Sequence, residues 1–400
     1  MKVLQVIDLG FEAGGAEKLV RIIRDGMQSL GHEVFVLSTD RNPAGRSLFS
    51  DATVPAVSGR ALTRLRKYLW NHEAYRAVRS AIRDFNPDIV HLHTICEFSP
   101  AVLWGIGHRP ALLTVHGPEE FTLNLLPWLL PPTDYRHRSY RREDIRPVGR
   151  LRYSYLRHLQ RPAYLLALKR VKLVTVPSKF MASTVSRDFP HTPIKVLYPG
   201  TIIPREVSER GSRRPLVLFV GRLERIKGVD WLINAFAEVA RDRPESRLRI
   251  VGDGHERRAL EEMTKELGLT EGVEFTGWLE ADELRQEYAD ASVVVIPSVC
   301  PECFPLVGLE ALASGRAIIG SNVGGIPELI DPEKTGLIVE PGDISGLAQA
   351  IDSLLFDDQR LATAAQRCSV KARDFSMNSF IERQLEAYSH VLGHAESSGA

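Results

Sequence analysis

A repeated alternation of short apolar runs with segments of helical periodicity constrains the fold more than any other feature of this sequence. Runs such as Val3 to Ile7 and Leu216 to Val220 are each followed by a turn and then by apolar residues at helical spacing. Strands that are buried on both faces read as continuous apolar runs, and a helix between two strands allows them to run parallel. The pattern fills both halves of the 400-residue chain. We therefore predict an α/β fold with two Rossmann-like, doubly wound parallel sheets.

The runs also predict where the two domains meet. Strand candidates lie at residues 3–7, 34–37, 89–92, 112–115 and 173–176 in the first half, and at 216–220, 248–251, 293–296 and 317–319 in the second. Between them, Tyr198 to Pro215 is a polar stretch rich in Pro and Gly, as expected of a linker. We place the domains at residues 1–205 and 206–375, with a helix at 376–400 that packs back on the first domain. Ligands bind beyond the carboxyl ends of such strands, so two facing sheets predict an interdomain cleft.

Composition narrows the range of functions. Lys and Arg total 51 and Asp and Glu total 50, so bulk charge predicts no nucleic-acid partner. No apolar run is long enough to cross a membrane, and Gln5 and Asp8 interrupt the first run, which predicts a strand rather than a secretory signal. The four cysteines do not make a disulfide framework. These features predict a cytoplasmic protein.

Cys300 and Cys303 have C-x-x-C spacing, which could form a redox centre or half of a zinc site. A second pair of metal ligands is missing, and the segment follows an apolar run rather than opening a thioredoxin-like helix. We favour the interpretation as two small buried thiols.

The turn after the first strand contains Gly10, Gly14 and Gly15 and precedes a helical pattern over residues 18–30. Glycines let a phosphate or a sugar approach the backbone, and the first amides of a helix attract anions. A tight turn without a ligand is the structural alternative. Asp40 lies where a nicotinamide-dependent oxidoreductase would bind ribose, but the glycines do not have G-x-G-x-x-G spacing.

A basic loop follows the first strand of the second half. It delivers Gly221, then Arg222 and Lys227, just before a helix that starts near Gly228. Arg can bind two oxygens at once and Lys acts as a point charge, so the pair could neutralise a diphosphate. An ordinary surface turn would have the same residues.

The segment after residues 293–296 carries two carboxylates, Glu302 in a loop and Glu310 in a helix that starts near Pro305. At 1.5 Å of rise per residue, Glu310 lies roughly 7 Å along the axis, which is about the reach from a diphosphate to a ribose. The amides of Leu306 and Val307 would face the phosphates. A glycosidase-type acid and base is the alternative, but those groups flank the scissile bond from both sides.

Together these motifs resemble glycosyltransferase family 4, whose members are retaining enzymes of the GT-B fold. The resemblance includes Arg222 with Lys227, the E-x7-E pair, the Gly14–Gly15 turn, Val251 to Gly254, and Val323 to Glu328. It is best over residues 215–345 and fair at Thr114 to Gly117.

The resemblance implies roles for individual residues. Arg222 and Lys227 would hold the donor diphosphate, Glu310 the ribose and Glu302 the transferred sugar. His116 would contact that sugar near the reacting carbon, although a histidine after a strand can also be purely structural. The complete nucleotide-sugar site would consist of Gly14, Gly15, Gly221, Arg222, Lys227, Gly252, Trp278, Glu302, Phe304, Pro305, Leu306, Val307 and Glu310, with a core role as the alternative for Trp278.

Relatives of this kind use no divalent metal, and the sequence has no D-x-D motif in a fitting loop. We therefore predict no metal and no cofactor besides the nucleotide sugar, which is a co-substrate. The resemblance implies transfer of a hexosyl group from a UDP- or GDP-sugar, bound by the C-terminal domain, to a glycan or lipid-linked acceptor bound by the N-terminal domain, in cell-surface polysaccharide or glycoconjugate synthesis. A front-side path with retention is preferred, and a nucleotide-sugar epimerase of related fold is the alternative.

An Arg-rich insertion breaks the alternation between Pro118 and Arg161. From Arg136 to Arg161 arginines and tyrosines alternate with few acids. A solvated basic loop is one interpretation. The other is a patch for an acceptor or for the anionic inner face of a membrane, where each clustered Arg gains about 1 kcal/mol.

Overall fold

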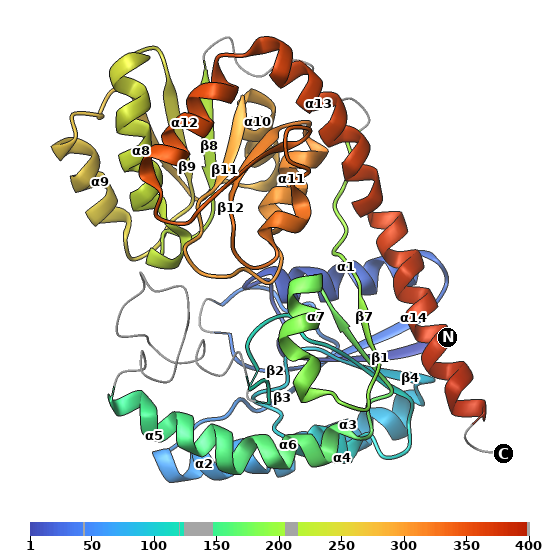
Figure 1. Ribbon diagram of the computed structural model, residues 1–400. Helices are drawn as coiled ribbons and strands as arrows, with labels where there is room; N and C mark the ends of the chain where they lie inside the picture. Colours follow the sequence, from blue (N-terminus) through green and yellow to red (C-terminus); the bar gives the residue numbers. More distant parts are fainter. Residues whose placement is uncertain (43–44, 120, 124–146, 205–214, 398–400) are drawn as a thin grey trace. The chain divides into compact units, whose positions relative to one another are not determined.

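The computed structural model describes residues 1–42, 45–119, 121–123, 147–204 and 215–397, and these form two compact units (Figure 1). Unit 1 contains the described residues up to Tyr198 together with those from Phe380 onward, and unit 2 runs from Pro199 to Ser379. Residue 120 and residues 124–146 of the Arg-rich insertion lie outside the described residues. Among the described helices, none combines the length and the apolar character that crossing a membrane requires.

The sheet of unit 1 is parallel throughout, in the order β3-β2-β1-β4-β5-β6-β7. Its strands are β1 (Lys2–Leu9), β2 (Glu33–Thr39), β3 (Ala52–Val54), β4 (Ile89–Leu92), β5 (Ala111–Thr114), β6 (Leu173–Val176) and β7 (Ile194–Val196). Val3 of β1 lies opposite Val34 of β2 on one side and Ile89 of β4 on the other. The strand order therefore reverses between β1 and β4.

The helices of unit 1 cover this sheet (Figure 1). They are α1 (Gly15–Ser29), α2 (Ala61–Leu69), α3 (His72–Phe85), α4 (Ala101–Gly105), α5 (Pro147–Tyr155), a π-helical turn (Leu156–Gln160), α6 (Arg161–Leu168) and α7 (Lys179–Val185). The long helix α14 (Met377–Ser397) enters unit 1 at Phe380. There Phe380 and Ile381 are buried, and Tyr388 hydrogen-bonds His91 of β4.

Unit 2 is built in the same way, with the parallel order β10-β9-β8-β11-β12-β13. Its strands are β8 (Leu216–Val220), β9 (Arg247–Val251), β10 (Val273–Gly277), β11 (Val293–Ile296), β12 (Ala317–Ser321) and β13 (Gly336–Val339). Its helices are α8 (Val229–Asp242), α9 (Arg257–Glu266), α10 (Ala281–Asp290), α11 (Leu306–Ala313), α12 (Ile344–Leu355) and α13 (Asp358–Ala372), followed by the start of α14.

Helix α8 shows why the apolar spacing specifies this packing. Val229, Leu232, Ile233 and Phe236 share one face of the helix because Leu232 and Ile233 follow Val229 by three and four residues and Phe236 follows them by four and three. All four are buried in one core cluster with residues of β8 and α12. Truncating a fully buried phenylalanine such as Phe236 to alanine costs about 3–5 kcal/mol. This face holds α8 in place, and its N-terminus lies beside the loop described below.

The prediction of two doubly wound parallel sheets is confirmed. The division between the units falls at Pro199, not near residue 205, because Thr201 exchanges backbone hydrogen bonds with Phe375 (2.8 Å) and Met377 (3.0 Å) of unit 2. These bonds attach the first residues of the predicted linker to the second unit.

Candidate active site

The strand order of unit 2 reverses between β8 and β11, which is where ligands of open α/β sheets bind. The loops that follow these two strands run from Gly221 to Gly228 and from Pro297 to Pro305. They are tied together, since the Val299 N–H donates to the Ile226 carbonyl at 3.0 Å. The basic loop and the acidic loop of the sequence analysis are therefore neighbours.

Glycines allow the backbone to pass closely at this edge. A Cβ on Gly252, which follows β9, would lie 2.0 Å from the Gly221 carbonyl oxygen, and its φ of 127° also disfavours any side chain. Gly228 is left-handed at φ 65°, and a Cβ there would lie 2.1 Å from the Pro297 oxygen. Only glycine fits these positions, which explains two of the motif residues on packing grounds.

Lys227 and Glu302 form an ion pair at the centre of this edge. The Lys227 Nζ lies 2.9 Å from Glu302 Oε1, and both side chains are largely buried, at 22% and 18% exposed. Ser298 Oγ donates to the same carboxylate oxygen. A cation held this way is oriented by the protein rather than by solvent.

The loop Val323 to Glu328 fixes the backbone of Glu302. The Gly325 N–H donates to the Glu302 carbonyl at 2.7 Å. Gly324 has a φ of 60°, and a Cβ on it would lie 2.3 Å from that same oxygen. The second glycine-rich motif of the sequence therefore supports the acidic loop.

Helix α11 begins directly after the acidic loop. Pro305 is its N-cap in an extended conformation, and the helix runs from Leu306, so the N–H groups of Leu306 and Val307 stand at its positive end. Glu310 lies one turn further, and its Oε2 accepts a hydrogen bond from the Tyr288 hydroxyl at 2.9 Å. Burial, and then the Glu310 charge, hold the pKa of Tyr288 well above its ordinary range, so Tyr288 stays a donor.

Two predicted residues at this edge lie differently from the rest. Arg222 follows β8 as predicted, but its largely exposed guanidinium pairs with Glu224. Trp278 follows edge strand β10 and is 71% exposed, so its alternative assignment to the core is wrong. Phe304 is buried and packs on Phe375.

In unit 1 the Gly14–Gly15 turn starts α1, with Gly14 as an extended N-cap. Burial raises the pKa of the Glu17 carboxyl, and the neighbouring backbone amides of Glu17 and Gly14 lower it to a smaller extent. The glycine spacing did not reveal this buried carboxylate beside the turn.

His116 follows β5 and contacts a second histidine. Its Nε2 lies 2.9 Å from Nδ1 of the buried His93, and the two rings stack. The His93 ring in turn lies against His91, with 3.9 Å between ring centroids. Burial lowers the pKa of His116 to about 4, so this imidazole is neutral at pH 7.

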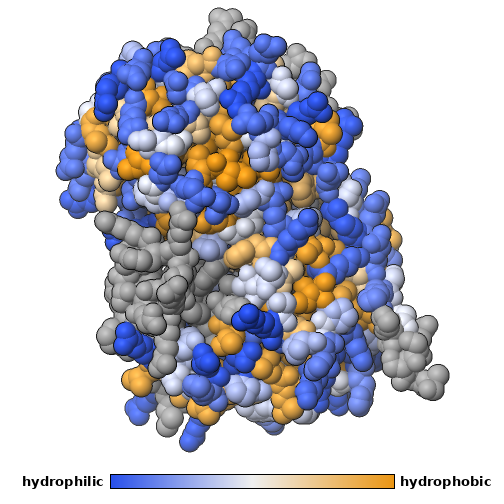
Figure 2. Space-filling view, in the orientation of Figure 1, coloured by the Kyte–Doolittle hydropathy of each residue, from blue (hydrophilic) through white to orange (hydrophobic). Residues whose placement is uncertain are grey.

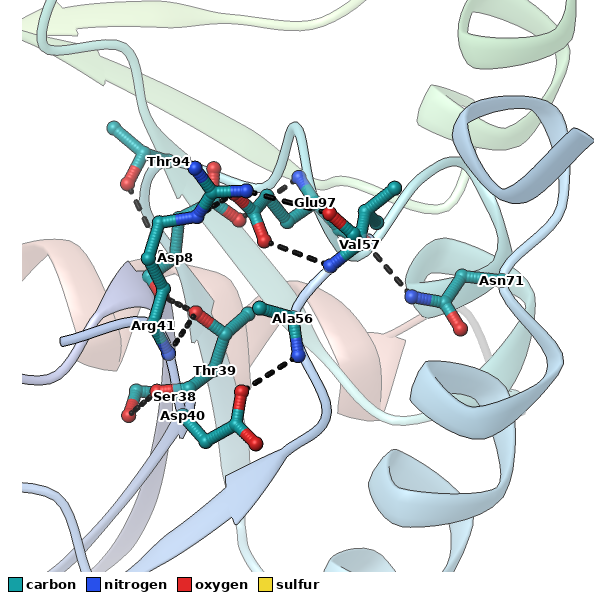
Figure 3. Close-up of polar contacts among 10 residues, drawn as sticks. All are labelled: Asp8, Ser38, Thr39, Asp40, Arg41, Ala56, Val57, Asn71, Thr94 and Glu97. Carbon is teal, nitrogen blue, oxygen red and sulfur yellow. Dashed lines mark hydrogen bonds and ion pairs between the residues drawn. The ribbon is translucent and has the colours of Figure 1, made fainter. Parts of the chain in front are cut away.

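Further polar side chains meet at the carboxyl edge of the unit 1 sheet (Figure 3). Arg41, after β2, pairs with Glu97, after β4, at 2.5 Å, and the Glu97 N–H donates to Asp8 of β1 at 3.1 Å. Asp40 accepts from the Ala56 N–H at 2.7 Å. That carboxylate, considered above for ribose binding in an oxidoreductase, holds a loop here.

Sequence reasoning missed the partners that orient the predicted residues. Tyr288 lies four residues after Leu284 in α10, and a buried tyrosine needs a partner for its hydroxyl, so a search for one would have led to it. Ser298 and His93 gave no comparable signal.

The two cysteines of the C-x-x-C segment differ in burial: Cys300 is buried and Cys303 is half-buried. Neither forms a disulfide. Over the part of the chain that the structure describes, no group of three or more His, Cys, Asp or Glu side chains is arranged to hold a metal ion.

Comparisons with known proteins fit this arrangement. The family description Glycosyltransferase Family 4 matches residues 13–203, and Glycosyl transferases group 1 matches residues 214–357. A D-inositol 3-phosphate glycosyltransferase of Nocardia farcinica is 37% identical over 185 residues, which cover 44% of this chain and 41% of that protein. A GDP-mannose-dependent alpha-(1-6)-phosphatidylinositol monomannoside mannosyltransferase of Mycolicibacterium smegmatis is 32% identical over 223 residues, which cover 50% and 58%. The chain thus spans about half the length of the curated relatives it matches.

A solved structure extends the likeness to the whole chain. Anabaena HepE, in complex with UDP, has a TM-score of 0.73 at 20% identity, and the alignment covers 98% of this chain and 100% of HepE. Two parallel-sheet units with this likeness define the GT-B fold. With both halves matched, the chain belongs to the family 4 type of glycosyltransferases.

Proposed function

We propose that this chain is a retaining glycosyltransferase that moves a hexosyl group from a UDP- or GDP-sugar to a glycan or lipid-linked acceptor in cell-surface polysaccharide or glycoconjugate synthesis. The observation that carries the proposal is the convergence of Lys227, Glu302 and the leading amides of α11 at the β8/β11 reversal. UDP in the HepE structure, and the inositol-phosphate and phosphatidylinositol names of the relatives, support the donor and acceptor classes.

The leaving diphosphate gains negative charge as the bond to the sugar breaks. Lys227 is positioned by Glu302, whose carboxylate also accepts from Ser298, so Lys227 neutralises that charge without first being reoriented. Arg222 reaches the same loop edge and would exchange its Glu224 partner for a phosphate oxygen. The Leu306 and Val307 amides add positive partial charge.

The neighbouring parts of the donor meet the carboxylates. Glu310, oriented by Tyr288, accepts hydrogen bonds from ribose hydroxyls, and Glu302 accepts from the transferred sugar. Trp278, exposed at the same sheet edge, stacks on the base.

His116 completes the assignment from unit 1. A neutral imidazole can hydrogen-bond a sugar hydroxyl without placing a second positive charge near the reacting carbon. In the preferred front-side path, the departing phosphate takes the proton of the acceptor hydroxyl as the new glycosidic bond forms, so the anomeric configuration is kept. Arg222 and Lys227 replace a divalent metal, and turnover in EDTA equal to turnover in magnesium is the expected result.

The test is a thermal-shift screen followed by a turnover assay. UDP or GDP should raise the melting temperature while NADH should not, because the G-x-G-x-x-G spacing is absent. Nucleotide sugars that bind are then incubated with cell extract, and products are detected by mass. Epimerisation of the donor without transfer would instead favour the related epimerase, and stabilisation by NADH alone would contradict the proposal.

A further inference from the structure

Helix α2 and the continuous helix from α5 through the π-turn to α6 run side by side in unit 1 (Figure 1). The Tyr155 hydroxyl donates to the Leu65 carbonyl at 3.0 Å, and Gln160 Nε2 donates to the Tyr68 carbonyl at 3.2 Å. These bonds join the two helices into one surface, which we call the α2/α5–α6 face.

Three leucines form a stripe along this face. Leu151, Leu159 and Leu166 are all exposed, at 81%, 58% and 54%. Leu151 and Leu159 are eight residues apart, which corresponds to one α-turn plus one π-turn, and Leu159 and Leu166 are seven residues apart, which corresponds to two α-turns. The π-helical segment Leu156–Gln160 therefore keeps the three leucines aligned. Leu156, Gln160 and Tyr164 of the same helix are buried.

Basic residues predominate around this face, although Glu73 at the start of α3 pairs with Lys67 of α2 at 2.8 Å. Residues 59–71 and 147–170, which include both helices, contain no Asp or Glu. Arg64 and Arg66 on α2, and Arg152 on α5, are exposed. Figure 2 shows apolar side chains interspersed with hydrophilic ones at this end of unit 1.

The two helices also enclose a shallow recess of about 300 Å³. Arg64, Leu65, Arg152, Tyr155 and Leu156 are among the residues that line it. A recess of this size admits one acyl segment or headgroup but no folded element.

We propose that the α2/α5–α6 face lies on an anionic lipid bilayer, with the leucine stripe inserted among the acyl chains and the arginines at the headgroup phosphates. Exposed leucines beside exposed arginines match an interfacial helix, which gains from apolar burial and from attraction to anionic lipid together. An acidic protein partner would use the arginines but gives no reason for the aligned leucines. The inference deepens the proposed function, because a bilayer is where a lipid-linked acceptor is met.

The test is co-sedimentation of the full chain with vesicles, which requires no turnover and so succeeds or fails independently of transferase activity. Phosphatidylcholine–phosphatidylglycerol vesicles should bind the wild type and phosphatidylcholine vesicles should not. Leu151→Ser with Leu159→Ser should lower the partition coefficient about tenfold or more. Arg64→Gln with Arg152→Gln should lower it about fivefold for each arginine, and added salt should reduce wild-type binding.

Matched controls come from other surfaces of the protein. Leu30→Ser removes a leucine of similar exposure (54%), and Arg258→Gln removes an exposed arginine of unit 2, so neither should alter vesicle binding. Melting curves and nucleoside diphosphate binding show that each variant is folded. The proposal would be overturned if the wild type bound both vesicle types equally, if the double leucine variant bound as the wild type does, or if the control variants lost binding. It would also be overturned if the face bound an acidic protein and that binding needed the arginines but not the leucines.

Discussion

Tyr288→Phe removes a single oxygen atom that orients Glu310 and leaves the rest of the side chain in its buried position. The lost contact is the 2.9 Å hydrogen bond from the Tyr288 hydroxyl to Glu310 Oε2. Phenylalanine fills the same space, so the packing of α10 should survive. The substitution therefore separates orientation of the carboxylate from folding of unit 2.

The size of the effect follows from the kind of bond. A hydrogen bond to a charged group contributes about 1.5–3 kcal/mol, and water that reaches the half-buried Glu310 would replace part of it. We expect the affinity for a nucleoside diphosphate to fall by about 1–2 kcal/mol, which is roughly a 5- to 30-fold rise in Kd. Stability of the ligand-free protein should change little.

Isothermal titration of UDP and GDP into wild type, Tyr288→Phe, Glu310→Ala and the double variant measures this coupling. Because Tyr288 acts through Glu310, its substitution should have no further effect once Glu310 is alanine. A wild-type Kd in Tyr288→Phe, or losses that simply add in the double variant, would refute the reasoning.

Three further outcomes are expected. Lys227→Ala should lower kcat by about 10²- to 10³-fold in a donor turnover assay, because the variant lacks the positive charge that stabilises the leaving diphosphate and Glu302 loses its cation partner. Wild-type turnover in this variant would contradict the proposed role of Lys227. Gly252→Ala should lower the melting temperature clearly more than Gly268→Ala does. Both glycines have a positive φ, but only a Cβ at residue 252 would clash, at 2.0 Å from the Gly221 oxygen. Equal decreases in melting temperature would show that this close packing does not require glycine at residue 252. The stability contributed by neutral His116 should be complete above pH 6.5 and should fall as the pH drops towards the folded-state pKa of about 4. The melting temperature of His116→Gln should therefore decline less steeply than that of the wild type as the pH is lowered over that range.

The sequence predicted the buried strands better than the edge strands. The four strands that apolar runs did not reveal, β3, β7, β10 and β13, are the outer strands of the two sheets. An edge strand pairs on one side only and is often short or polar, as Ile194–Val196 with its central Lys195 shows. Such strands lack the continuous apolar run that a central parallel strand requires.

The grouping of the candidate site residues was predictable where they lie in loops that follow strands. Gly221 directly follows β8, and Lys227 and Glu302 lie further along the loops after β8 and β11. The order of a doubly wound sheet places the ends of these two strands side by side. Tyr288 and Glu17 were not predictable, because their contacts depend on which way a helix turns its face. Arg222 shows the same limit, since its position was clear but its pairing with Glu224 was not.

The central claim is that the β8/β11 edge of unit 2 binds the diphosphate of a nucleotide sugar. Titration calorimetry of UDP and GDP against the wild type and Lys227→Met tests this claim most directly. The variant His116→Gln, which changes a residue of unit 1, is titrated in the same way for comparison. The wild type should bind at least one of the two nucleotides saturably, and this binding should be lost or strongly weakened in Lys227→Met. Binding that is unchanged in Lys227→Met, or no binding of either nucleotide to the wild type, would contradict it.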